Sequence, residues 1–369
     1  MRFAIDRNQL LPPLQAICAV VGAKQTSPVL SHILVSTAGN ALYLTATDSG
    51  VELIAKTTLL GSEKDEAITV PAKKLLDICR NLPEETVCEF SQKNDQLVLS
   101  AGSSKFSLST LPASQFPNMD TGSILIEIVL KESDLKQLLE KTYFAMAQQD
   151  VRYYLNGLLF EITGNKITVV ATDGHRLAIS NMKLANTATE NISIIVPRKG
   201  ILELLRVLNN SENEVKLQIG KNFITMILEN LTYISKLIEG RFPNYKTVIP
   251  KNGDKTLIVN KDILKQALNR AAILSHDKHH AIRAEISETI QKIFAVNSQN
   301  EESEEEIPVN FTGNNNLEIG LNINYLQDVL SAIPYNEVKM TFTDSNSSIL
   351  IEANTTDDDS LYVIMPMRL

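Results

Sequence analysis

The stretch ATDGHR, residues 171–176, brings an acid, a histidine and an arginine together directly after an apolar run that ends at Val170. One interpretation is a catalytic turn, in which Asp173 orients His175 and Arg176 holds an anion. The other is a tight turn at the end of a strand, whose polar side chains are solvated. The six residues alone leave both interpretations open.

Motifs that would support the catalytic interpretation are missing from the rest of the chain. There is no G-x-x-x-x-G-K-[ST], no H-E-x-x-H, and no Cys or His spacing typical of a metal site. No nucleophile within reach of Asp173 and His175 is identifiable. We therefore expect no catalytic residue, no metal and no cofactor.

Length and composition are those of a soluble globular protein of two or three domains. The chain has 369 residues, of which 44% are hydrophobic and 21% charged. It contains no apolar run of the ~18 residues that a membrane span needs, and no export signal at its start. The three cysteines (Cys18, Cys79 and Cys88) lack a C-x-x-C pair and suit reduced thiols. We expect a cytoplasmic protein with no membrane partner.

The chain contains three copies of one pattern. YLTATDSGVEL (43–53) resembles VVATDGHRLA (169–178), which sets Asp48 and Asp173 125 residues apart. In the same order, TVPAKKLLDICRNL (69–82) resembles IVPRKGILELLRVL (195–208), and QFPNMD (115–120) resembles RFPNYK (241–246). A weaker third copy of the second phrase is LNINYLQDVLSAI (321–333). A period of this length indicates repeated domains, which we place at 1–122, 128–246 and 255–369.

Each copy predicts two amphipathic helices and several alternating strands. Alternation with a period of two is typical of half-buried antiparallel sheet, so each copy is an α+β unit. The predicted helices lie near 8–20, 72–81, 132–146, 198–208, 261–271 and 323–333.

The net charge of −8 alone argues against nucleic-acid binding, but the charge is distributed unevenly along the chain. Counted over the six helices, the formal charge is +4, so the rest of the chain carries −12. If the helices line one surface, that surface is mildly basic inside an acidic shell. A charge of two on any single helix is equally well explained by chance.

The whole chain, from MRFAIDRNQLL to its last residue, resembles the bacterial sliding clamp family, the beta subunit of DNA polymerase III. The resemblance is carried by SKFSLSTLP (104–112), DVRYYLNGLLFE (150–161), VATDGHRLA (170–178), IVPRKG (195–200) and MPMRL (365–369). It implies a head-to-tail homodimer: a ring of six domains, with helices around a central hole and sheets outside. It also implies a processivity factor that slides on duplex DNA without catalysis and is loaded by an external clamp loader.

The resemblance further implies sequence-independent contacts to double-stranded DNA. Such contacts must be weak, because a ring is retained by topology and has to slide. For Tyr153 and Tyr154 the alternative is that one faces the core and the other the solvent. The implied DNA-binding residues are Lys24, Gln149, Tyr153, Tyr154 and Lys199.

In this family the turn at 171–176 forms part of a pocket that binds short peptides of partner proteins. Expected partners are the DNA polymerase III alpha subunit, other clamp-binding polymerases and repair proteins. The apolar side chains would form an adaptable groove, with arginine and histidine as donors at its rim. Thr247 stands where some relatives have a basic residue, which predicts weaker binding of acidic peptides; MPMRL is alternatively a closing edge strand. The implied pocket residues are Arg152, Leu155, Thr172, Gly174, His175, Arg176, Leu177, Pro243, Val248, Val363, Ile364, Met365, Pro366, Met367, Arg368 and Leu369.

The dimer contact implied by the family joins the first copy to the third. An apolar centre with ion pairs at its rim is a common interface plan, although EESEEE (301–306) alone would suit a solvated loop. The implied residues are Lys74, Lys105 and Phe106 on one side, and Ile273, Leu274, Glu301, Glu302, Glu304, Glu305 and Glu306 on the other.

Two other functions are compatible with parts of the sequence. An enzyme built around His175 would need the missing catalytic motifs. A monomeric repeat protein that grips DNA would need a face more basic than +4, and its binding would depend steeply on salt.

Overall fold

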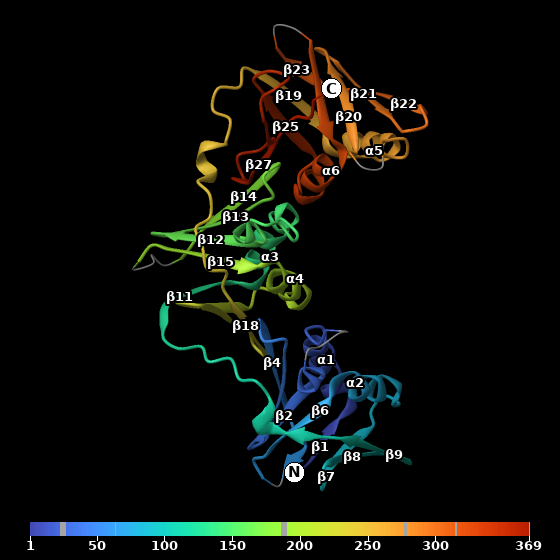
Figure 1. Cartoon of the computed structure of the whole chain (residues 1–369), viewed down its shortest axis with the longest axis vertical. Coiled ribbons are helices and arrows are strands. Elements are labelled where there is room, and N and C mark those ends of the chain that lie inside the picture. Colours follow the sequence, from blue (N-terminus) through green and yellow to red (C-terminus); the bar gives the residue numbers. More distant parts are fainter. Residues whose placement is uncertain (23–26, 63, 186–189, 277–278, 314–315, 369) are drawn as a thin grey trace. The chain divides into compact units, whose positions relative to one another are not determined.

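The computed structural model describes residues 1–22, 27–62, 64–185, 190–276, 279–313 and 316–368 (Figure 1). The predicted helices are confirmed, most to within two residues at either end. In the described residues they are α1 (Arg7–Cys18), α2 (Ala72–Asn81), α3 (Glu132–Glu140), α4 (Arg198–Val207), α5 (Lys261–Ala272) and α6 (Ile323–Ala332).

The prediction that the third helix continues to residue 146 is wrong, because α3 ends at Glu140. Just beyond it, the Thr142 hydroxyl donates to the carbonyl of Leu138 at 2.8 Å, and the backbone of Thr142 leaves the helical region with φ −132°. The chain then forms a 3₁₀ turn, η3 (Tyr143–Ala145). A hydroxyl bonded back to the preceding turn competes with regular helix hydrogen bonds.

The contacts divide the chain into two compact units. The first consists of residues 1–136 and 199–237, and the second of residues 137–198 and 238–369. The middle copy of the repeat is therefore split. Its residues 128–136 and 199–237 belong to the first unit, and its residues 137–198 and 238–246 belong to the second.

The first unit contains two antiparallel sheets. In the nine-stranded sheet, β4 of the first copy pairs with β18 of the second, Glu52 opposite Ile234. Its strand order is β10 (Leu111–Pro112), β6 (Ala67–Pro71), β2 (His32–Ala38), β3 (Ala41–Thr47), β4 (Val51–Thr58), β18 (Leu231–Lys236), β17 (Phe223–Ile227), β16 (Glu214–Gly220), β11 (Ile124–Lys131). The five-stranded sheet runs β5 (Gly61–Ser62), β1 (Arg2–Asp6), β7 (Val87–Lys93), β8 (Gln96–Ala101), β9 (Ser104–Ser109).

The second unit repeats this arrangement. Here β14 of the middle copy pairs with β27 of the third, Leu177 opposite Val363. The nine-stranded sheet runs β15 (Ile192–Pro197), β12 (Gly157–Thr163), β13 (Lys166–Thr172), β14 (Arg176–Lys183), β27 (Leu361–Ile364), β26 (Ile349–Ala353), β25 (Glu337–Phe342), β19 (Lys255–Asn260), β23 (Asn310–Thr312). The four-stranded sheet runs β22 (Glu302–Pro308), β21 (Ile290–Val296), β20 (Ala281–Ile286), β24 (Leu317–Asn322).

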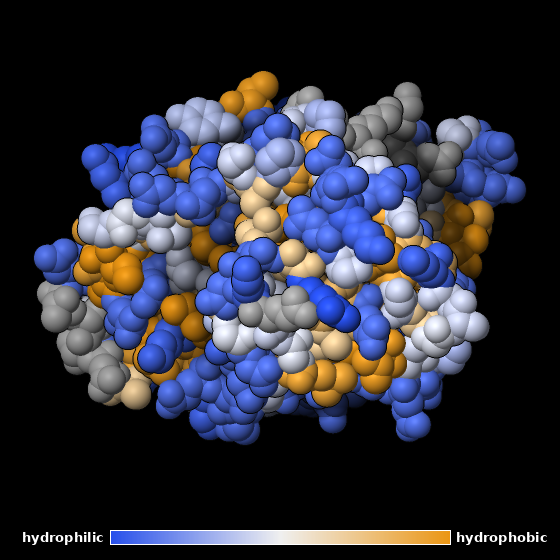
Figure 2. Space-filling model, turned by 90° about the horizontal axis from the view of Figure 1, so that it is seen from below, coloured by the Kyte–Doolittle hydropathy of each residue, from blue (hydrophilic) through white to orange (hydrophobic). Residues whose placement is uncertain are grey.

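The predicted alternation is visible in the strands, since β1 and β20 bury every second residue. The apolar faces of the helices pack on the sheets of their own unit, α1 on β4 and α5 on β21 and β22. On the face seen in Figure 2, hydrophilic residues predominate and the hydrophobic ones lie in separate patches. No helix in the described part of the chain is long and apolar enough to cross a membrane. The fold is thus a repeated α+β architecture, as predicted.

The three cysteines are free thiols, as the sequence predicts. Burial raises the pKa of Cys18 and Cys79 to about 12 and that of Cys88 to about 11. These thiols are therefore protonated at neutral pH and unsuited to nucleophilic chemistry.

Candidate functional site

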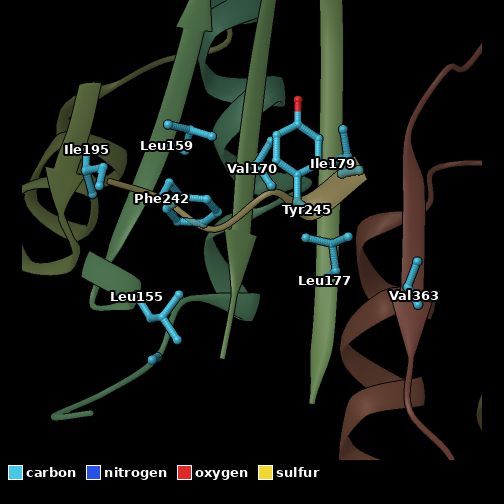
Figure 3. Close-up of a cluster of buried hydrophobic side chains, with 10 residues drawn as sticks. Leu155, Leu159, Val170, Leu177, Ile179, Ile195, Phe242, Tyr245 and Val363 are labelled. Carbon is cyan, nitrogen blue, oxygen red and sulfur yellow. The ribbon is translucent and has the colours of Figure 1, made fainter. Parts of the chain in front are cut away.

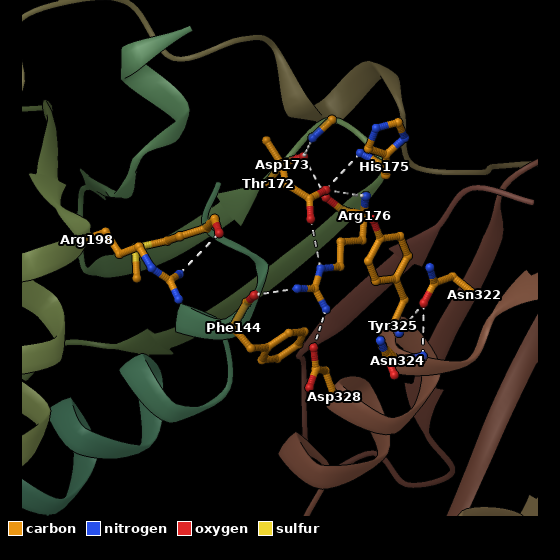
Figure 4. Close-up of polar contacts among 12 residues, drawn as sticks. Phe144, Thr172, Asp173, His175, Arg176, Arg198, Asn322, Asn324, Tyr325 and Asp328 are labelled. Atoms are coloured by element: carbon orange, nitrogen blue, oxygen red, sulfur yellow. Dashed lines mark hydrogen bonds and ion pairs between the residues drawn. The ribbon is translucent and has the colours of Figure 1, made fainter. Parts of the chain in front are cut away.

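The turn at 172–176 is held by its own side chains. Asp173 Oδ1 accepts hydrogen bonds from the backbone N–H groups of His175 at 2.9 Å and Arg176 at 3.0 Å. The Thr172 hydroxyl donates to the carbonyl of Arg176 at 2.6 Å. The carboxylate of Asp173 thus points to the backbone of the turn and to Arg176 (Figure 4). Asp173 holds the backbone of His175 in place, which is the structural interpretation of ATDGHR.

The first copy builds the same turn. Asp48 Oδ1 accepts from the N–H groups of Gly50 at 2.9 Å and Val51 at 2.7 Å, and the Thr47 hydroxyl donates to the carbonyl of Val51 at 2.8 Å. The left-handed position is Ser49 (φ 73°) in the first copy and Gly174 (φ 90°) in the second. A Cβ atom on Gly174 would lie 2.9 Å from the guanidinium of Arg152, so the glycine also permits this close approach.

Arg176 joins the middle copy to the third within the second unit. Its Nε donates to Asp173 Oδ2 at 3.0 Å, its Nη1 to Asp328 of α6 at 2.5 Å, and its Nη2 to the carbonyl of Phe144 at 2.7 Å (Figure 4). The guanidinium also lies over the ring of Tyr325, 4.5 Å from its centre. Because the side chain is only 12% exposed, its donors are used within the protein. Arg176 also lines the apolar groove beside this turn, and its role as a donor to a peptide stays a prediction.

An apolar groove with a volume of about 200 Å³ lies beside this turn. It is lined by most of the predicted pocket residues, which come from the 3₁₀ turn at 153–155, the turn at 172–176, β14, β27 and the segment around Pro243. The lining residues are Arg152, Leu155, Thr172, Gly174, His175, Arg176, Leu177, Pro243, Asn244, Tyr245, Val248, Ser348, Val363 and Met365.

The floor of the groove belongs to a buried hydrophobic cluster (Figure 3). Leu155, Leu177 and Val363 are each at most 4% exposed, and the Tyr245 hydroxyl donates to Glu161 at 2.8 Å. At the edges, Val248 is 53% and Met365 48% exposed. A rigid floor with exposed apolar edges suits a ligand that inserts apolar side chains.

Comparison with known proteins covers the whole chain. The DNA polymerase III beta subunit family matches with its N-terminal domain at residues 1–120, its central domain at 129–244 and its C-terminal domain at 246–368. The chain is similar to the beta sliding clamps of Pseudomonas aeruginosa (44% identity) and Salmonella typhimurium (45%), each over 100% of both chains. It also resembles a crystal structure of the Pseudomonas aeruginosa DNA polymerase III subunit beta, with a TM-score of 0.96, 44% identity and full coverage of both chains.

The chain belongs to the DNA polymerase III beta subunit family. Members of this family, the beta sliding clamps, are non-catalytic processivity subunits of DNA polymerase III. The interpretation of ATDGHR as a catalytic turn is therefore wrong, in agreement with the bonds of Asp173 to its own backbone.

The other described residues that were expected in the clamp pocket lie outside the lining of the groove. Ile364 is fully buried in β27, opposite Arg176. Pro366 follows the wall residue Met365; Met367 donates its N–H to the carbonyl of Gly320 at 2.8 Å, and Arg368 lies beside the four-stranded sheet. Leu369 is outside the described residues.

Sequence reasoning missed three groove residues. Asn244 and Tyr245 belong to the repeated phrase RFPNYK, so the repeat itself was a signal for them. Ser348 lies in a turn before β26 and carried no signal in the sequence. Thr247 donates its hydroxyl to the carbonyl of Asn244 at 2.8 Å and is exposed near the groove without lining it.

Of the residues expected to touch DNA in a clamp, Gln149, Tyr153 and Lys199 are exposed. Gln149 has a left-handed backbone (φ 56°). Tyr153 and Tyr154 lie on a 3₁₀ turn, η4 (Tyr153–Leu155); Tyr153 is 58% exposed, while Tyr154 is partly buried against the hydrophobic cluster. Lys199 forms an ion pair with Asp48. Lys24 is outside the described residues.

The residues expected at the clamp dimer contact lie on edge strands and at a helix end. Lys105 and Phe106 are on β9, the edge of the five-stranded sheet, and exposed Lys74 is on α2. In the second unit, Ile273 at the end of α5 is 77% exposed and Leu274 is half-buried. The expected glutamates lie on or beside β22, the edge of the four-stranded sheet. Glu305 is held by Arg270 at 2.5 Å, Glu304 and Glu306 lie beside Lys292 (3.1 and 3.6 Å), Glu301 accepts from Asn297, and Glu302 is exposed.

Proposed function

We propose that two copies of this chain close head to tail into a ring around duplex DNA, and that the groove tethers partner proteins through short peptides. Membership of the beta sliding clamp family supports the processivity role. The apolar groove beside the 172–176 turn is the observation that carries the tethering role. The partners we assign to it are the DNA polymerase III alpha subunit, other clamp-binding polymerases and repair proteins.

The chemistry of the groove favours a peptide with apolar anchors. Burial of leucine- or phenylalanine-sized side chains contributes about 1.5–3 kcal/mol each, and the flexible side chain of Met365 adapts to different shapes. Of the two rim arginines, Arg152 is the more accessible, with a side chain 47% exposed, although Asp150 already holds it. We therefore expect affinity to come mainly from apolar contacts. With a threonine at 247, acidic partner peptides bind less tightly than they would beside a basic residue.

The edge strands support a head-to-tail dimer. Two β22 edges cannot pair favourably, because their glutamates would face each other as like charges. β9 carries Lys105 and is the complementary edge. Pairing β9 of one copy with β22 of the other uses two different surfaces, and two such contacts close a ring. Ile273 and Leu274 then form the apolar centre of the contact.

Weak DNA contacts suit this topology. Of the helix cations, Lys199 and Arg270 already form ion pairs with carboxylates outside the helices, Asp48 and Glu305 respectively. The basic charge left for phosphates is thus lower than the formal +4. A monomeric protein that grips DNA would need more, so we favour retention by linkage.

We place the repeated clamp domains at 1–122, 128–246 and 255–369, and the protein in the cytoplasm, associated with the nucleoid during replication. Loading onto DNA falls to a separate clamp loader.

Retention on DNA distinguishes a ring from a gripping protein. The protein is loaded by a bacterial clamp loader onto nicked circular DNA, and half of the sample is linearised at ~0.5 M salt, which suppresses phosphate contacts. We expect retention on the circle and loss from the linear DNA. Equal loss from both, with loading verified at low salt, would mean that contacts alone hold the protein.

A further inference from the structure

We propose that Asp48 is an internal competitor for DNA phosphate at Lys199: it holds the lysine ammonium and keeps this DNA contact weak. The inference rests on the proposed role of Lys199 in DNA binding and adds a residue that sets the strength of that contact. Asp48 belongs to the first copy of the repeat and Lys199 to α4 of the second, and both lie in the first unit.

The geometry of the turn explains why Asp48 is available to Lys199. Its Oδ1 accepts from the backbone of Gly50 and Val51, while its Oδ2 accepts from the ammonium of Lys199. In the middle copy the equivalent second oxygen, on Asp173, is taken by Arg176 of the same turn. The first copy has Val51 at the position of Arg176 and so lacks a cation within the turn. A cation from the neighbouring helix takes that place.

The same comparison extends to the helices. In the second unit a cation of the turn, Arg176, pairs with an anion of α6, Asp328. In the first unit an anion of the turn pairs with a cation of α4, and Glu203, which stands where the third copy has Asp328, is held by Arg206 at 2.9 Å. The turn thus supplies the cation of this ion pair in the second unit and the anion in the first. In the first unit that anion is Asp48, and its partner on the helix is Lys199.

Asp48 is largely buried and Lys199 is exposed, so a phosphate can compete with Asp48 for the lysine. Burial disfavours the charge on Asp48, but Lys199 and the backbone N–H groups outweigh it and lower the pKa of the carboxyl, so it is ionised at neutral pH. The Asp48 side chain is 14% exposed, whereas Lys199 is 51% exposed. A phosphate can approach the exposed lysine only by replacing a fixed carboxylate. The net gain of that contact is therefore reduced.

The test is the affinity of the full chain for a fluorescent duplex oligonucleotide at ~50 mM salt, where phosphate contacts dominate. Asp48→Asn keeps the oxygen that accepts from Gly50 and Val51 but removes the charge that holds Lys199. Since an exposed pair contributes up to about 1 kcal/mol, we expect DNA affinity to rise about two- to fivefold. The same substitution in a Lys199→Ala background should have no such effect, because the lysine is its route of action.

Asp120→Asn is the matched control. Asp120 also accepts from a backbone N–H two residues on, at 2.9 Å from Gly122, so the substitution makes the same charge change in the same kind of turn. An equal rise in affinity with Asp120→Asn, an equal rise in the Lys199→Ala background, or no rise at all would overturn the inference.

A different result would count against the proposed role of Lys199 in DNA binding. If Lys199→Ala leaves DNA affinity unchanged, Lys199 is not a DNA contact, and both its proposed role and the inference fall. If Lys199→Ala weakens binding while Asp48→Asn does not strengthen it, only the role of Asp48 is removed.

Discussion

Glu52 stands in the first copy where Leu177 stands in the second, 125 residues later. Leu177 forms part of the groove floor, whereas Glu52 places a carboxyl group in β4 that is only 3% exposed. Burial raises the pKa of Glu52 to about 7, with a smaller opposing effect of a backbone hydrogen bond from Met119. The equivalent of the groove floor in the first copy therefore carries an acid that is hard to ionise. This difference gives the two copies different chemistry at the same place in the repeat.

A pH dependence of stability follows from this residue. The folded protein keeps the Glu52 proton up to about pH 7, while the unfolded chain releases it near the ordinary value of 4.5. Stability from this group is therefore present at low pH and lost as pH rises from about 4.5 to 7. We expect Glu52→Gln to stabilise the protein by about 1–2 kcal/mol at pH 8 and by much less at pH 4.5. The urea midpoint at the two pH values measures this.

Glu89→Gln serves as the control for that experiment, because Glu89 is exposed on β7. The control should leave the pH dependence unchanged. An equal effect of Glu52→Gln at both pH values would contradict the assignment of the buried acid.

The groove depends on the short segment that follows β27 as well as on strands. Met365 forms one wall and donates its N–H to the carbonyl of His175 at 2.9 Å, and Met367 is fixed to Gly320 of β24. This segment thus runs from the 172–176 turn to the four-stranded sheet. β27 itself is held on both sides, by β14 and β26.

Deletion of residues 365–369 should remove partner binding while the fold is kept. The deletion takes away one wall of the groove but leaves the pairing of β27 intact, so we expect the melting temperature to change little. Binding of the polymerase alpha subunit should fall by at least tenfold, measured by surface plasmon resonance. Met365→Ala, which shortens only the wall side chain, should give a smaller loss. Normal polymerase binding by the truncated protein would refute the groove assignment.

The threefold repeat makes much of the fold predictable from the sequence. The second helix of each copy, the two Asp-centred turns and the phrase RFPNYK could be located by comparing the copies with one another. The division into two units could not, because alternation gives the faces of a strand and not its partner. The pairs β4–β18 and β14–β27 join different copies, and nothing in their sequences names the neighbour. The contact between Arg176 and Asp328 could not be predicted for the same reason, because the two residues lie 152 positions apart in the sequence.

A single substitution can test the proposed oligomeric state. Ile273 is 77% exposed at the end of α5, so a charge there costs the folded chain little, yet the proposed dimer buries it. We expect Ile273→Glu to yield monomers in sedimentation at micromolar concentration, and Leu274→Glu to weaken the dimer further. Ile263→Glu makes the same change on the same helix, at a side chain that is 41% exposed and outside the proposed contact. It should remain dimeric; an unchanged dimer with Ile273→Glu would remove this residue from the interface and leave the β9–β22 pairing to carry the ring.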